Sequence, residues 1–125
     1  MQTVELPNES LPQTLNEFTS THEGWLVSLD VLNSEIGAQP EISELPLVGI
    51  WTEEIDHDRS ITVSAARSAG EHISHTIRDA KRVQIERTDE GADAALAVES
   101  GDGTKTILRF RSAGRPDIID GFVAP

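Results

Sequence analysis

The segment RVQIERTDEGADAALAVESGDGTKTILRF, residues 82–110, decides the fold class that the sequence predicts. Alternation with a period of two is typical of β-strands that bury one face. Short turn-forming segments, Asp89–Gly91 and Ser100–Gly103, separate the alternating runs. Such links join antiparallel neighbours, because a parallel crossover needs about a dozen residues or more. The apolar positions of the three runs are Val83 and Ile85, then Ala94, Leu96 and Val98, then Thr106, Leu108 and Phe110.

The same alternation occurs earlier in the chain, over residues 25–32, 45–51 and 61–65. We therefore expect a sheet of six to eight antiparallel strands that continues from residue 25 to residue 111. Trp25 and Trp51 both fall on the apolar side of their runs. Packing in the core is the expected role of both indoles, rather than stacking on a ligand.

A helical pattern precedes the strands, over residues 10–23. Ser10 is suited to cap its amino end, Pro12 is tolerated in the first turn, and Gly24 is suited to end it. The apolar stripe is narrow, so we expect the helix to lie on the sheet. The stripe consists of Leu11, Leu15, Phe18 and His22.

These patterns predict an α+β fold, in which one N-terminal amphipathic helix is followed by an antiparallel meander, either a curled sheet or a partly open barrel. We expect a single domain over residues 1–112, a size that can bury a core without disulfides. Residues 113–125 lose the alternation and form a tail that is either frayed or docked.

The charge of the chain is uneven. It has 22 acidic and 10 basic residues, a formal net charge of −12, and residues 1–58 contain neither Lys nor Arg. Those residues carry the whole net charge, while residues 59–125 have ten acids and ten bases. Binding to nucleic acids or anionic membranes relies on clustered cations, so we expect neither partner.

The composition also bears on the environment. There is no cysteine, and lysine occurs only at positions 81 and 105. Many carboxylates with few lysines fit either a source that lives in concentrated salt or simple acidic solubility. The segment MQTVELPNES lacks the features of a signal peptide, so we expect a soluble, cytoplasmic protein.

The heptapeptide EHISHTI, residues 71–77, raises the question of a metal site. On a helix, His72 and His75 would share a face and could bind one ion. The β-branched neighbours favour a strand, in which the two histidines point to opposite faces with Cα atoms about 10 Å apart. His75 is then expected to be a structural histidine with a hydrogen-bond partner. His72, on the polar face, remains a candidate ligand-binding residue.

Two further charged features of the sequence could bind a ligand. The run EEIDHD, residues 53–58, lacks the ligand spacing of an EF-hand and fits a solvated hairpin. Arg109 and Arg111 share a strand face with Lys105 and could grip a phosphate or carboxylate ligand. The alternative is that these cations pair with acidic neighbours such as Glu86 or Glu99, or with the acidic first half of the chain.

Three stretches together resemble a known family: HEGWLVSLDVLNSEIGAQPEISELPLVGI, EHISHTI and RVQIERTDEGADAALAVESGDGTKTILRF. The chain is similar, over about residues 6–112, to short prokaryotic proteins grouped as domain of unknown function 5335. The resemblance implies a stand-alone cytosolic domain. It implies no activity, no catalytic residue and no cofactor.

We therefore expect a non-enzymatic protein that works by association, as a homodimer or with an unidentified protein partner. The expected contact surface is the neutral second-half sheet or the apolar tail residues Ile118, Ile119 and Phe122. The alternative is a small-ligand or metal-binding protein built around the cavity of a curled sheet. Its polar contacts would come from His72, Arg109 and Arg111.

Overall fold

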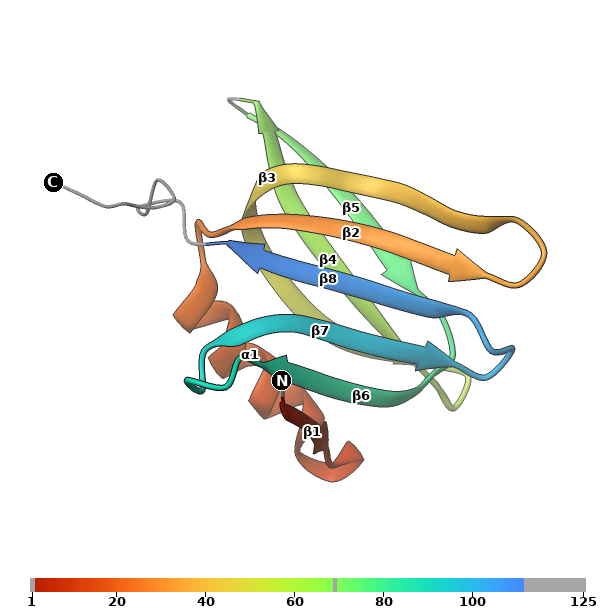
Figure 1. The fold of residues 1–125 in the computed structure, drawn as a ribbon. Helices are drawn as coiled ribbons and strands as arrows, with labels where there is room; N and C mark the ends of the chain where they lie inside the picture. The colour runs from red at the N-terminus through yellow and green to blue at the C-terminus, as the bar shows by residue number, and fades with distance from the viewer. Residues whose placement is uncertain (1, 69, 112–125) are drawn as a thin grey trace, which may run out of the picture.

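The computed structural model describes residues 2–68 and 70–111 of the 125-residue chain. They form eight antiparallel strands, one 3-10 turn and one α-helix (Figure 1). The elements are β1 (Gln2–Leu6), η1 (Asn8–Ser10), α1 (Leu11–His22), β2 (Leu26–Asn33), β3 (Gly37–Ile55), β4 (Asp58–Ser68), β5 (Glu71–Ile77), β6 (Ala80–Arg87), β7 (Asp93–Ser100) and β8 (Lys105–Arg111).

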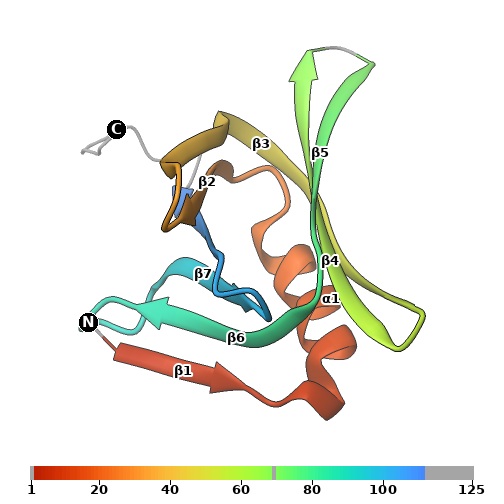
Figure 2. The same ribbon diagram turned by 90° about the vertical axis from the view of Figure 1, so that its right-hand side faces the viewer.

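All eight strands belong to one sheet, in the order β1-β6-β7-β8-β2-β3-β4-β5. The sheet curls without closing into a barrel, and α1 lies between its two arms (Figure 2). The expected α+β class and antiparallel sheet are confirmed. One detail of the expected order is wrong: a short strand, β1, precedes the helix and pairs with β6 along Gln2–Leu6.

The helix forms where its pattern predicts it. The four residues of the predicted stripe are its buried residues, and Gly24 adopts a positive φ of 86° just after its end. Ser10 occupies the capping position, but its side chain makes no capping hydrogen bond. Thr19 fastens the helix to β3, because its hydroxyl accepts from the Ile50 amide at 3.0 Å and donates to the Ile50 carbonyl at 3.1 Å.

The core lies between the concave face of the sheet and α1. The predicted alternation of the last three strands is confirmed, because Val83, Ile85, Leu96, Val98 and Leu108 are all at most 3% exposed. Burial of these side chains stabilises the curled form, since each fully buried aliphatic side chain contributes about 1.5–3 kcal/mol relative to an exposed one.

Strand β3 departs from simple alternation. Its pairing with β4 shifts register between Leu47 and Gly49, and Ile50 is buried at 2% exposure while Trp51 is 43% exposed. The core position expected for Trp51 is therefore wrong. The cause is a β-bulge, which adds a residue to one strand and reverses the face of every side chain beyond it.

Candidate functional site

Strand β5 divides the two neighbouring histidines. Its pairing places His75 opposite Val63, which is 1% exposed in the core, whereas His72 pairs with Ala66 and is exposed. The predicted separation of His72 and His75 onto opposite faces is confirmed, so these two imidazoles do not share one ion.

His75 lines a pocket of about 200 Å³ on the concave side of the sheet. The pocket lies where β2, β5 and β7 end and β8 begins. These strand ends are on the right of Figure 1, and α1 lies toward the opposite side of the sheet. Its size suits a ligand of a few non-hydrogen atoms. The lining residues are Val31, His75, Thr76, Ile77, Arg78, Ser100, Asp102, Thr104 and Thr106.

The inner wall of this pocket carries polar groups without protein partners. Thr106 is 2% exposed, and its hydroxyl makes no hydrogen bond to any residue within the described ranges. The half-buried His75 ring likewise has no hydrogen-bond partner in the described part of the chain, unlike the satisfied histidine that we expected. A buried polar group left unpaired costs about 1–3 kcal/mol, so such groups call for an explanation.

The rim of the pocket carries one acidic and one basic side chain, Asp102 and Arg78. Asp102 accepts a hydrogen bond from the Thr104 amide at 3.0 Å, which lowers the pKa of its carboxyl below the ordinary value. Arg78 is exposed and forms no ion pair with any residue that the structure describes. One oxygen of the Asp102 carboxylate therefore already accepts a hydrogen bond, whereas the Arg78 guanidinium has no ion-pair partner among the described residues.

The predicted ligand residue His72 lies on the opposite face of β5 from this pocket. On that outer face the Thr62 and Thr76 hydroxyls are 3.1 Å apart, and the Ser74 hydroxyl donates to Ser64 at 3.2 Å. These hydroxyls satisfy one another across β4 and β5. The outer face beside His72 is consequently polar, uncharged and internally bonded.

Arg109 and Arg111, predicted as candidate ligand-binding residues, each form an ion pair with a carboxylate. Arg109 donates to Asp30 at 2.7 Å, and Arg111 pairs with Glu44. The expected pairing with carboxylates of the acidic first half of the chain is confirmed for both arginines. Their remaining capacity to hold a ligand is limited because both carboxylates already engage them.

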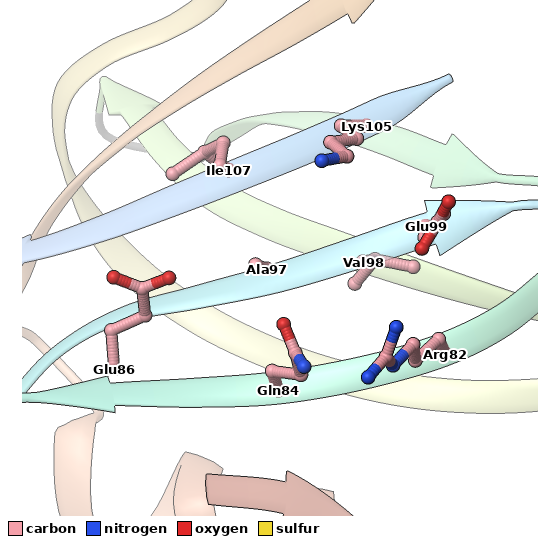
Figure 3. Close-up of a pocket in the computed structure, with 8 residues that line it drawn as sticks. All are labelled: Arg82, Gln84, Glu86, Ala97, Val98, Glu99, Lys105 and Ile107. Carbon is pink, nitrogen blue, oxygen red and sulfur yellow. The ribbon is translucent and has the colours of Figure 1, made fainter. Parts of the chain in front are cut away.

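The convex face of β6, β7 and β8 has a second, smaller depression of about 150 Å³ (Figure 3). Lys105, Glu99 and Arg82 stand in a row across the three strands, and the small Ala97 forms part of the floor. Arg82 is paired with Glu5 at 3.1 Å. None of the polar side chains that line this depression is buried, in contrast to Thr106 in the concave pocket.

A buried polar cluster around His22 was missed by the sequence reasoning, which assigned His22 only to the helix stripe. Its Nδ1 donates to the Phe18 carbonyl at 2.8 Å, and its Nε2 lies 3.3 Å from Asp93. Asp93 also accepts from Arg87 at 3.0 Å. The imidazole stacks on Phe18 with ring centroids 4.1 Å apart. A histidine on an otherwise apolar stripe is the signal that could have predicted such a cluster.

Several other expectations concern metals, membranes and the tail. Within residues 2–68 and 70–111, no group of three or more His, Asp or Glu side chains is arranged to hold a metal ion. In the acidic run, Glu54 pairs with Arg59 at 2.9 Å. None of the described helices is long and apolar enough to span a bilayer. The tail residues Ile118, Ile119 and Phe122 lie outside the described residues.

Comparison with known proteins places the chain in a family. Residues 2–117 match the Family of unknown function (DUF5335). The chain belongs to DUF5335. It is also similar to an uncharacterised protein of Aquifex aeolicus (strain VF5), with 27% identity over 113 residues that cover 90% of this chain and 96% of that protein. No solved structure gives a significant match. Membership of DUF5335 confirms the resemblance seen in the sequence.

Proposed function

We propose that this DUF5335 protein is a non-enzymatic association module that forms a homodimer through the free edge of β5. One observation carries the proposal: among the described residues, β5 is the last strand of the sheet and is hydrogen-bonded on one side only, to β4. An edge strand presents a row of unpaired backbone groups that readily pairs with another chain.

The composition of β5 supports pairing. Proteins that keep an edge strand monomeric place Lys, Pro or a bulge on it. Residues 71–77 contain no Lys or Pro, and Glu71, at the end of the strand, already accepts from Ser68 at 3.0 Å. Antiparallel pairing of β5 with a second copy is self-complementary, which is the requirement for a two-fold dimer.

The charge distribution supports the same surface. Two chains of net charge −12 repel one another, so a contact forms best where the local charge is smallest. The outer face of β4 and β5 carries hydroxyls and His72 in place of carboxylates. The opposite edge, β1, has five residues against seven in β5, and Glu5 lies on it.

Sedimentation equilibrium at the salt concentration of the source cell tests the proposal. The wild-type chain should sediment as a dimer. Replacing His72 and Thr76 together by Glu should give a monomer, because the pairing would bring like charges together across the strands. The matched control carries the same two added charges on the other edge, at Gln2 and Thr3, and should stay dimeric.

Removal of residues 113–125 tests whether the dimer forms through β5 or through the tail, which the sequence analysis gave as another expected contact surface. A truncated chain that remains dimeric supports pairing through β5. A wild-type chain that is monomeric at high micromolar concentration, or a truncated chain that alone becomes monomeric, contradicts it.

A further inference from the structure

The concave pocket beside His75 supports an inference independent of the proposed dimer. Pocket residues come from β2, β5, β8 and the β7–β8 turn, segments far apart in the sequence. A curled sheet that only needed a core would fill this end with aliphatic side chains. The structure places Thr106 and His75 there instead, facing a space of about 200 Å³.

The unpaired inner groups define what a ligand must offer. The Thr106 hydroxyl, at 2% exposure, and the His75 ring can each donate a hydrogen bond and find no acceptor within the described residues. A ligand oxygen placed between β5 and β8 would satisfy both, and its binding would remove the cost of leaving them unpaired.

Arg78 at the rim favours an anionic ligand. Arg78 has no carboxylate partner among the residues described, although five other arginines of this chain are paired: Arg59, Arg82, Arg87, Arg109 and Arg111. Asp102, the carboxylate of the pocket, is turned to the Thr104 amide. An anionic ligand placed beside Arg78 would supply the carboxylate partner that its guanidinium lacks among the described residues.

The apolar part of the lining limits the rest of the ligand. Val31 and Ile77 contribute hydrocarbon to the wall beside the polar groups. A fully inorganic oxyanion would leave that surface without a matching partner, whereas a short alkyl group would cover it.

We propose that this pocket binds a small aliphatic carboxylate of a few carbon atoms. Its carboxylate accepts hydrogen bonds from Thr106 and His75 and is attracted by Arg78. Its alkyl group packs against Val31 and Ile77.

NMR titration of the full chain with butyrate tests this proposal, with the neutral isostere butyramide and with inorganic phosphate as comparison probes. Saturable amide shift changes are expected in residues 75–78 and 104–106 with butyrate, and much weaker binding with either comparison probe. Arg78→Gln and Thr106→Val should each weaken butyrate binding about tenfold, the loss expected for one charge-assisted hydrogen bond.

A matched control keeps the result interpretable. Arg67→Gln removes an exposed arginine from the end of β4, away from the pocket, and should leave the affinity unchanged. The Thr106→Val chain should fold, since valine has the shape of threonine and removes an unpaired hydroxyl.

Three results would overturn the proposal. They are the absence of saturation at tens of millimolar butyrate, equal affinity for butyramide, and phosphate that binds the same residues more tightly than butyrate.

Discussion

His22 shows how one side chain can connect two elements. Its ring is 2% exposed and contacts Phe18 on its own helix, Phe110 on β8 and Asp93 at the start of β7. A carbonyl can only accept, so Nδ1 donates to Phe18, while Nε2 faces the Asp93 carboxylate. Each nitrogen of the buried ring thus lies beside an oxygen atom, which explains why a polar residue is tolerated in the apolar stripe.

Replacement of His22 should separate its packing from its polar contacts. His22→Ala leaves a cavity and an Asp93 carboxylate without its ring partner, and should lower the free energy of unfolding by about 3 kcal/mol. His22→Phe keeps an aromatic ring and should cost about 1–2 kcal/mol. Urea denaturation measures both. Thr21→Ala, on the exposed side of the same helix, is the control, and equal losses in all three variants would contradict this role.

Asp102 predicts a pH dependence of stability. The folded pKa of this carboxyl lies below its ordinary value of 3.8 because the Thr104 amide donates to the carboxylate. The stabilisation is therefore complete above 3.8 and is lost as the pH falls through the lower folded value.

The corresponding measurement compares urea denaturation of wild type and Asp102→Asn at neutral pH and at several values below 3.8. Wild type should be the more stable at neutral pH, and the difference should shrink with acidification. Glu90→Gln in the β6–β7 turn is the control for losing a charge alone. A difference that does not change with pH would exclude the hydrogen bond as its cause.

At the scale of elements, local patterns predicted most of the fold. The helix stripe and the alternation of β6, β7 and β8 depend on neighbours within a few residues, so the sequence reveals them. Strand β3 does not follow its pattern, because its bulge is set by pairing with β4. The sequence pattern did not predict strand β1, because its five residues form a strand only through pairing with β6.

The bulge in β3 predicts that replacing Ile50 destabilises the protein more than replacing Trp51, the opposite of what uninterrupted alternation would predict. Ile50→Ala should lower the free energy of unfolding by about 2–4 kcal/mol, because Ile50 is 2% exposed. Trp51→Ala should cost about 1 kcal/mol, well below the usual loss for a buried Trp, because the indole is 43% exposed and rests near Gly49. Chemical denaturation of both variants tests the order. A larger loss for Trp51→Ala would show that the indole is buried after all.

At the scale of the whole molecule, the fold brings the two charge halves together. Arg59, Arg82, Arg109 and Arg111 from the neutral half pair with carboxylates of the acidic half. Each such exposed pair contributes only about 0–1 kcal/mol, so the net charge of −12 is partly offset and not neutralised. Repulsion among the remaining carboxylates should then have a larger effect on stability than the attraction within these ion pairs.

Stability should consequently rise with salt. At about 1 M KCl the screening length falls to about 3 Å, which weakens repulsion over long distances more than it weakens close ion pairs. Thermal melts across a KCl series should show a rising melting temperature. A chain with Glu9, Glu41 and Glu53 replaced by Gln should show a smaller rise, because three exposed carboxylates are gone. A melting temperature that is constant in salt would refute the argument from net charge.

The sequence by itself determined the helix face, the separation of His72 from His75, the strand alternation and the charge imbalance, because these depend on local periodicity and composition. The tertiary structure alone decided the exposure of Trp51, the partners of Arg109 and Arg111, and the pocket that joins His75 to Thr106. Those features arise from pairing and curvature between distant segments. His75 and Thr106 are thirty-one positions apart, and only the curl of the sheet brings them to one wall.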